Sequence, residues 1–184
     1  MKKTVTTCVL FAVLASAMYA AESQGPAGFF MVLGPRIGGS YVMDTPESFT
    51  SSVRALYPTG SYFPAFTLFG VMIEQRILLG QTRSHFAFQE EILVGGLEQG
   101  IALPEAAVLI GYRDFQGFEF GTGPIVSLAG VSVIVAIGWT FSYRGVFVPV
   151  DLSFIIPSAT RPAAIGLTTG FNFQISGVEE SPPP

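Results

Sequence analysis

The hydrophobic pattern of residues 131–143 has a period of two. Odd positions hold Val, Val, Val, Ile, Trp, Phe and Tyr, and even positions are small or weakly polar except for Ile134. Because successive side chains of a strand point to opposite faces, the segment predicts a strand with one apolar face and one small, polar face. Its length exceeds the roughly five or six residues of a typical strand and satisfies the roughly nine to eleven of a tilted transmembrane strand. We therefore expect this segment to be one strand of a membrane barrel.

The same period, interrupted by turn-forming residues, recurs along the chain. Eight strands are predicted, at residues 29–42, 63–79, 84–94, 105–113, 118–128, 131–143, 146–156 and 163–175. The longest connection, residues 43–61, is rich in Asp, Thr, Pro, Ser and Gly, and we expect a short helical turn at 48–56 within it.

Two places depart from strict alternation. Pro64, Phe66 and Leu68 blur the beginning of the second strand, which predicts a β-bulge there or a start above the membrane. Glu90 falls on the apolar side of the third strand. Because a carboxylate facing lipid is costly, we expect a bulge at Glu90 or a position beyond the apolar band.

The connections predict how the strands are arranged. Tight turns follow the second, fourth and sixth strands, whereas the longer segments 43–61 and 95–104 lie at the other end. This asymmetry is typical of outer-membrane barrels, and closure leaves no unpaired strand edge in lipid. The fold class predicted is all-β, an eight-stranded antiparallel up-and-down transmembrane β-barrel. Two alternatives are a transmembrane helix over residues 125–141 and a soluble β-barrel or sandwich.

Aromatic residues on the predicted outward face gather near the tight-turn end of six strands. Barrels carry such girdles at the membrane interfaces. The girdle residues expected from the sequence are Phe29, Phe86, Phe88, Tyr112, Phe118, Phe120, Phe141, Tyr143, Phe171 and Phe173.

Both ends of the chain differ from the barrel segment. Lys2 and Lys3 precede an apolar run and small residues, the pattern of a cleaved signal peptide. We predict a signal peptide at 1–20, an outer-membrane β-barrel at 21–175 and a flexible periplasmic tail at 176–184. The sole cysteine, Cys8, falls within the signal peptide, so the mature chain has no disulfide and no Cys-based metal site.

Composition agrees with a membrane location. Hydrophobic residues make up 49% of the chain and charged residues only 12%, against about 25% charged in typical soluble domains. Removal of Lys2 and Lys3 takes the net charge from −4 to −6. This acidic balance argues against a nucleic-acid partner.

Charged residues within the predicted strands fall mostly on the inward face. An eight-stranded barrel has an interior just wide enough for side chains to fill, so these charges predict a buried structural ion-pair network or, alternatively, a narrow polar path. The predicted interior network consists of Arg36, Glu74, Arg76, Glu91, Arg113, Glu119 and Asp151.

The last predicted strand carries a spaced motif of Thr168, Gly170, Phe173 and Ile175. This motif resembles the C-terminal β-signal of outer-membrane proteins, although the chain continues for nine residues after it. The mature chain is similar in architecture to the small barrels typified by OmpX, OmpW and the OmpA membrane domain. Residues 117–124 and 166–173 also resemble small barrels of spirochaete outer membranes. The resemblance implies the outer membrane as location and the barrel-assembly machinery as partner, and it assigns no functional residue.

Candidate chemistry is sparse. The single histidine, His85, follows Ser84 at the predicted periplasmic end and lacks a third partner for general-base catalysis. We therefore expect an interfacial or turn histidine, with no catalytic, cofactor-binding or metal site. The function expected is a non-enzymatic integral outer-membrane barrel with an envelope-structural, surface-interaction or small-solute passage role. An extracellular ligand would bind through residues 43–61. The alternatives are a lipid-modifying outer-membrane enzyme and a soluble periplasmic binding protein.

Overall fold

The computed structural model describes residues 29–43, 47–60, 62–79, 84–144 and 146–177. The predicted signal peptide, with Cys8, and most of the predicted tail lie outside these residues. The strands are β1 (Phe29–Val42), β2 (Ala65–Leu78), β3 (His85–Gly95), β4 (Leu103–Arg113), β5 (Phe118–Ser127), β6 (Gly130–Tyr143), β7 (Val146–Ile156), β8 (Ala164–Gly170) and β9 (Asn172–Gly177). A helix, α2 (Glu47–Leu56), follows β1, and a 3₁₀ turn, η1 (Leu97–Gln99), follows β3.

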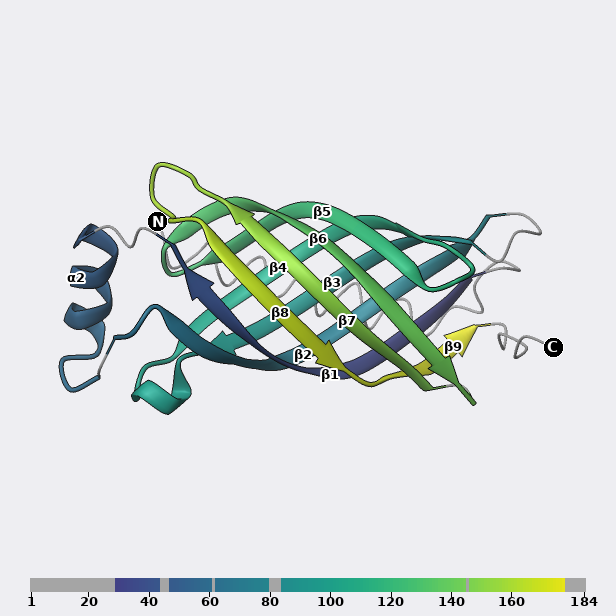
Figure 1. Cartoon of the computed structure of the whole chain (residues 1–184), viewed down its shortest axis with the longest axis horizontal. Coiled ribbons are helices and arrows are strands. Elements are labelled where there is room, and N and C mark those ends of the chain that lie inside the picture. The colour runs from purple at the N-terminus through teal and green to yellow at the C-terminus, as the bar shows by residue number, and fades with distance from the viewer. Residues whose placement is uncertain (1–28, 44–46, 61, 80–83, 145, 178–184) are drawn as a thin grey trace.

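The strands form one antiparallel up-and-down sheet that closes on itself (Figure 1). Neighbours in sequence pair around the ring, and β1 closes it by pairing with β2 on one side and with β8 and β9 on the other. The register between β1 and the last two strands is the same at Arg36–Gly170 and Leu33–Phe173. Strands β8 and β9 are therefore one position in the ring, interrupted at Phe171. The predicted all-β, antiparallel, closed fold is confirmed at this level.

The two ends of the barrel differ. One end, called the loop end, carries α2 and η1, and the other, called the turn end, carries the connections after β2, β4 and β6 as well as β9 (Figure 1). At the turn end, Gly117 adopts a φ of 102°, a conformation that residues with a Cβ rarely take. The Asp114 carboxylate accepts hydrogen bonds from the backbone of Gln116 and Phe118, which fixes this turn.

The bulge expected at each of these two places is absent. The alternatives, a start of the second strand above the membrane and a position of Glu90 beyond the apolar band, stay predictions. Strand β2 pairs with β1 without a shift from Ala65–Tyr41 to Ile77–Phe29. Glu90 lies in the middle of β3, opposite Ile73 and Val108 in unshifted registers, so it keeps a position of the outward face. It is nevertheless only 5% exposed. The blurred alternation of β2 has a different cause, because Phe66 and Leu68 face an interior that is itself apolar at the loop end.

The helical alternative for residues 125–141 is excluded, because this segment forms the end of β5 and most of β6. Within the described residues, no helix is both long and apolar enough to cross a membrane. The short helix expected at 48–56 is present as α2. The last strand extends to Gly177, two residues further than predicted, and pairs with β1 there.

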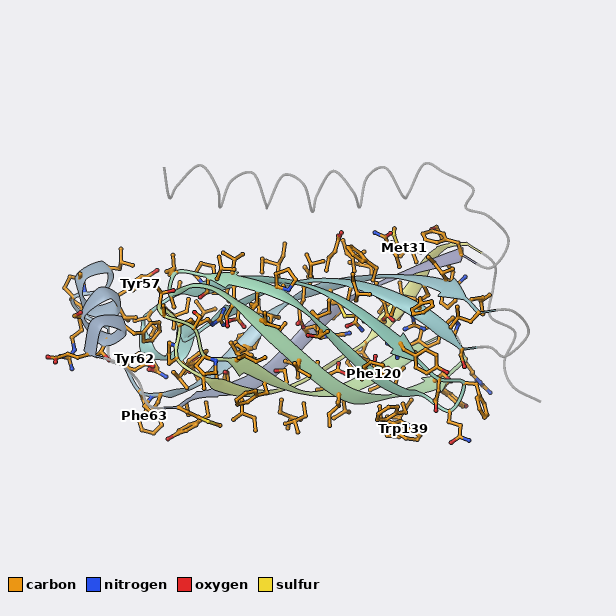
Figure 2. The ribbon with its side chains drawn as sticks, turned by 90° about the horizontal axis from the view of Figure 1, so that it is seen from above. Met31, Tyr57, Tyr62, Phe63, Phe120 and Trp139 are labelled. Atoms are coloured by element: carbon orange, nitrogen blue, oxygen red, sulfur yellow. The ribbon has the colours of Figure 1, made fainter. Side chains whose placement is uncertain are left out.

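The outer wall, meaning the outward-facing side chains of the strands, is apolar around the ring. In β6, Val135 is 40% and Ile137 is 49% exposed, and Trp139 projects from the wall (Figure 2). Aromatic residues are cross-strand neighbours near the turn end: Phe86 pairs with Tyr112 and Tyr112 with Phe120. The parity of a position, odd or even along its strand, decides whether its side chain faces inward or outward. Of the nine charged residues in the described strands, only Glu90 has the parity of the outward face. The polarity of a soluble protein is thus inverted.

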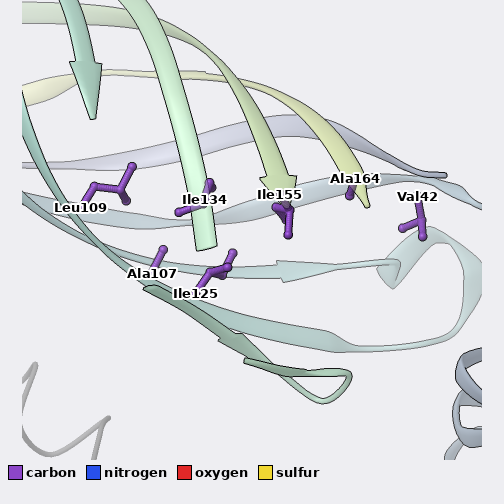
Figure 3. Packing of buried hydrophobic residues seen from close by; sticks show 7 residues of the cluster. All are labelled: Val42, Ala107, Leu109, Ile125, Ile134, Ile155 and Ala164. Atoms are coloured by element: carbon purple, nitrogen blue, oxygen red, sulfur yellow. The ribbon is translucent and has the colours of Figure 1, made fainter. Parts of the chain in front are cut away.

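The interior contains two layers. Near the loop end is an apolar layer, whose buried members converge from six strands (Figure 3): Val42, Ala107, Leu109, Ile125, Ile134, Ile155 and Ala164. Nearer the turn end is a charge layer, and beyond it a small hydrophobic cluster of Phe30, Val32 and Phe147.

Candidate functional site

The charge layer is built from inward positions of neighbouring strands. It comprises the seven residues predicted from the sequence: Arg36, Glu74, Arg76, Glu91, Arg113, Glu119 and Asp151. A spacing of two along a strand keeps side chains on one face, so Glu74 and Arg76 of β2 both point inward. Their side chains are 0% and 1% exposed. Because buried charges are expensive unless paired, their contacts determine whether the layer is stable.

Arg113 is the centre of this layer. Its Nη2 atom donates to both carboxylate oxygens of Glu74 at 2.9 Å, which links β4 to β2 across β3. It also lies 2.5 Å from the Glu119 carboxylate on β5, where Thr140 donates a further hydrogen bond at 2.6 Å. One guanidinium therefore connects two carboxylates on opposite sides of its own strand.

Arg76 completes the network on the turn-end side. It donates from Nε and Nη2 to the two oxygens of Glu74 at 2.9 and 3.0 Å. Its guanidinium lies 4.7 Å from the ring centre of Phe147 and 5.3 Å from that of Phe30. Such contacts with aromatic rings stabilise a desolvated cation. The two rings and the ion pairs together surround the Arg76 guanidinium, and the residue is only 1% exposed.

Arg36 forms a separate group. Its Nη1 atom donates to the Asn172 side chain at 2.8 Å, and its Nη2 atom lies 3.0 Å from the sulfur of Met72. The Nε atom is 3.9 Å from the Glu91 carboxylate, beyond hydrogen-bond distance. Gly170 gives Arg36 its space, because a Cβ there would lie only 2.7 Å from Nη1.

The structure thus brings the predicted interior residues together unequally. Glu74, Arg76, Arg113 and Glu119 form one hydrogen-bonded network, and Arg36 lies beside Glu91 without direct bonding. Asp151 faces the same interior, but no hydrogen bond or ion pair within the described residues reaches its carboxylate. The sequence indicated the shared face but could not indicate this difference in pairing.

The four residues of the predicted β-signal lie in β8 and β9, on either side of the interruption at Phe171. Thr168 and Gly170 are buried and face inward, whereas Phe173 and Ile175 are exposed on the outer wall.

His85 differs from the expectation of an interfacial or turn histidine. It is the first residue of β3, is only 2% exposed, and lies edge-on to Phe30 with ring centres 5.2 Å apart. Its parity with Gln89 and Glu91 places it inside the barrel. The position of His85 on the same face as Gln89 and Glu91 was a signal of its burial. Because His85 directly follows a turn, it was expected at the interface or in the turn itself.

An ion pair at the loop end was missed by the sequence reasoning. Glu105 of β4 accepts a hydrogen bond from Arg161 at 2.7 Å. Glu105 has the inward parity and could have been recognised, whereas Arg161 lies in the connection between β7 and β8, where no period constrains it. This pair joins two loop-end segments that are 56 residues apart in sequence.

The loop end is covered by α2 and η1. Phe49 of α2 packs edge-on against Tyr62, with ring centres 5.6 Å apart, and Tyr57 donates to the Ala102 carbonyl at 2.7 Å. Glu98 of η1 accepts hydrogen bonds from the backbone and hydroxyl of Thr67. These hydrogen bonds hold the pKa of the exposed Glu98 carboxyl below its ordinary value. Side chains of η1 therefore protect the edge of β2 where β3 does not reach.

No group of three or more His, Cys, Asp or Glu side chains in the described part of the chain is arranged to hold a metal ion. Comparisons of the chain with protein family models, with curated proteins and with solved structures find no match.

Proposed function

We propose that the chain is a non-enzymatic, integral outer-membrane β-barrel with a closed interior, which anchors a structured loop end in the cell envelope. The observation that carries the proposal is the inverted polarity of the strands. Large apolar side chains are exposed around the outer wall, while eight of the nine strand charges face inward. Exposure of this wall to water would cost roughly 25 cal/mol for each Å² of apolar surface, whereas exposure to the hydrocarbon of a bilayer would not carry this cost.

The dimensions support a membrane position. The β6 strand has 14 residues, which at a rise of about 3.3 Å and a tilt near 40° cover roughly 35 Å. The hydrocarbon core of a bilayer is about 30 Å thick. The closed ring also leaves no unpaired edge in lipid, which an open sheet would do. The outer membrane is proposed because the expected signal peptide and the β-signal-like motif belong to proteins of that membrane.

The obstructed interior favours an anchoring role over free solute passage. The network around Arg113, together with Phe30 and Phe147, obstructs the turn-end half, and the apolar layer narrows the other half to cavities of about 40 Å³. Within the residues that the structure describes, the helical elements outside the strands are α2 and η1, both at the loop end. These elements are the surface through which we propose that the barrel contacts partners.

The lipid-modifying enzyme alternative is disfavoured by the position of His85. Its ring lies inside the barrel against Phe30, separated from the outer wall where a lipid would be bound.

A charge placed on the outer wall tests the membrane position. Val135→Arg in the middle of β6 should reduce the free energy of folding into lipid vesicles by about 2–4 kcal/mol, because arginine would face hydrocarbon. Folding is measured by gel mobility with and without boiling and by urea titration. The matched control is Phe115→Arg, at an exposed turn-end position. It should change the free energy of folding by less than about 1 kcal/mol. Equal effects of both substitutions, or no heat-dependent mobility in the unsubstituted protein, would contradict the proposal.

Conductance across a planar bilayer tests the closed interior separately. The unsubstituted barrel should show no sustained single-channel current. A steady ohmic current from the folded protein would favour a passage role.

A further inference from the structure

A groove runs along the outer wall near the loop end, over β1 and the strands beside it. Its volume is about 510 Å³, which lies within the roughly 300–1,000 Å³ of ligand sites. The lining is mostly apolar and includes Tyr41, Leu152, Ile165 and Leu167. These four side chains are exposed on the outer wall, so the groove faces the surroundings of the barrel and not its interior.

The groove exists because Gly39 contributes no side chain to the outward face of β1. Gly39 pairs with Thr67 of β2 on one side and with Leu167 of β8 on the other. It shares the outward parity of Tyr41, whereas the other glycines of strands β1 to β8 have the inward parity. A Cβ at Gly39 would meet, within the described part of the chain, only the Phe66 carbonyl oxygen at 3.7 Å. The position is therefore open space and does not require glycine for packing.

The width of the groove suits a single hydrocarbon chain. Strands β2 and β8 flank β1, and at the usual spacing of about 4.8 Å between neighbouring strands they lie about 9.6 Å apart. The missing side chain of Gly39 therefore opens a channel between Thr67 and Leu167 that is about as wide as one extended acyl chain. A second copy of the chain would present a broad wall, which would bridge such a channel without filling it.

The charge at the edge of the groove is negative. Of the described residues that line it, only Glu98 of η1 is charged. The backbone and the hydroxyl of Thr67 donate hydrogen bonds to the Glu98 carboxylate, which fixes it on the side of the channel opposite Leu167. Glu98 is exposed, so this carboxylate can accept a further hydrogen bond from outside the protein. It would attract an ammonium group and repel an anionic headgroup.

We propose that this groove seats one membrane phospholipid whose headgroup carries an ammonium, of the phosphatidylethanolamine type. One acyl chain lies in the channel over Gly39, between Thr67 and Leu167, and the ammonium donates a hydrogen bond to Glu98. The inference rests on the proposed membrane position, because a bilayer is what brings acyl chains to the outer wall. It adds to that proposal the class of lipid that is retained and the place on the wall where it is bound.

The acyl-chain position is tested with the whole mature protein folded into vesicles of phosphatidylethanolamine and phosphatidylglycerol in equal amounts. A trace of phosphatidylethanolamine with a photoreactive diazirine on one acyl chain is included, and labelled peptides are mapped by mass spectrometry after illumination. Labelling should concentrate at residues 37–41 and 165–169, several-fold above the wall formed by β5 and β6. Gly39→Leu fills the channel and should reduce it at least about threefold, because the chain loses its packing contacts. Val133→Leu, on the outer wall of β6, is the matched control and should leave labelling unchanged.

The headgroup is tested in the same vesicles by placing the diazirine on phosphatidylglycerol instead. The phosphatidylethanolamine probe should label the groove a few-fold more strongly, a modest preference because an exposed ion pair contributes little. Glu98→Gln should remove the preference without moving the label to another part of the wall. Glu47→Gln, at the exposed start of α2, should leave the preference unchanged.

Gel mobility without boiling verifies that each variant is folded. Ala65→Leu, which narrows the same groove from β2, keeps the test decisive if Gly39→Leu fails to fold. Labelling spread evenly around the wall, equal labelling by the two probes, or unchanged labelling in both groove variants would overturn the proposal. Dimers that form in the vesicles and are lost in Gly39→Leu would overturn it in favour of a second copy of the chain. A protein that inserts into vesicles but is labelled evenly would refute this inference alone, whereas a protein that does not insert would refute the proposed membrane position.

Discussion

The two halves of the barrel interior solve the same packing problem with different chemistry. Toward the turn end, space is filled by ion pairs centred on Arg113 and by aromatic rings around Arg76. Toward the loop end, the interior is lined mainly by aliphatic side chains such as Ile134 and Ile155 (Figure 3), which leave a cavity of about 40 Å³. Both halves are enclosed by an equally apolar outer wall, so the difference lies wholly inside.

This difference explains where the sequence pattern is clear and where it is blurred. In the charged half, polar and apolar positions alternate, because one face is in the charged interior and the other on the wall. In the apolar half, both faces are apolar, and the alternation fails at Phe66, Leu68 and Ile134. An irregular pattern in a barrel strand is therefore not by itself a sign of an irregular backbone.

The largest loss of stability is expected when Arg113, at the centre of the charged half, is replaced. Arg113→Met leaves Glu74 and Glu119 without their shared partner, and an uncompensated buried charge costs about 3–5 kcal/mol. Urea unfolding of the folded protein, followed by gel mobility without boiling, should show this loss. Arg54→Met on the exposed surface of α2 is the control and should change stability by less than about 0.5 kcal/mol. A similar small change for Arg113→Met would mean that the ion pairs are dispensable.

A slightly smaller loss of stability is expected when a side chain of the apolar half is shortened. Ile134→Ala opens a void in the apolar layer and should destabilise the barrel by about 2–5 kcal/mol in the same urea titration. Ile137→Ala makes the same chemical change on the same strand but on the outer wall, where Ile137 is 49% exposed. It should cost less than about 1 kcal/mol, because detergent or lipid fills the space. If the two substitutions were equally costly, the assignment of the inner and outer faces would be wrong.

The smallest effect is expected at the rim of the apolar half, where η1 contacts β2. Glu98→Gln should speed hydrogen exchange of the Thr67 amide roughly a few-fold at neutral pH, because an exposed carboxylate is the stronger acceptor. The pKa of Glu98 is lowered in the folded protein. Its stabilising contribution is therefore present above the ordinary pKa of a glutamate and is lost as the pH falls through the lower folded value.

In the unsubstituted protein, the Thr67 amide should consequently become less protected at acidic pH, after correction for the intrinsic exchange rate. Glu47→Gln, at the exposed start of α2, should leave the protection of Thr67 unchanged. Protection of Thr67 that is independent of both pH and Glu98 would show that the hydrogen bond from its amide to the Glu98 carboxylate does not determine that protection.

The fold was largely accessible from the sequence because β-strands have a short, regular period. Seven of the eight predicted strands agree with the structure within two residues at each end, and the eighth corresponds to β8 and β9 together. The helix before β2 was expected at nearly its observed position. The errors arose from local rules applied without the neighbouring strands. A bulge was expected at Glu90 because a lone carboxylate on an apolar face is costly, yet pairing with β2 and β4 holds the register of β3 through that residue. The interruption at Phe171 left no mark on the alternation, since the parity is the same on both sides.

The charge layer was accessible only in part. Parity places Arg36, Glu74 and Asp151 on the inward face, but it does not say which charges meet. Partners on strands two positions apart around the ring, such as Arg113 and Glu74, depend on strand register and on the diameter of the barrel. Arg161 could not be anticipated, because it lies in a connection and reaches Glu105 only through the closure of the loop end.

The sequence by itself determined the strand period, the antiparallel hairpin order and the set of side chains that face inward, because these follow from residue spacing along one chain. Tertiary structure alone decided that the interior separates into a charged and an apolar half, that Arg113 is the hub of the ion pairs, and that Asp151 faces a cavity without a direct partner. The physical reason is that ion pairing and cavity formation depend on distances across the ring. Those distances are fixed only when β1 closes it.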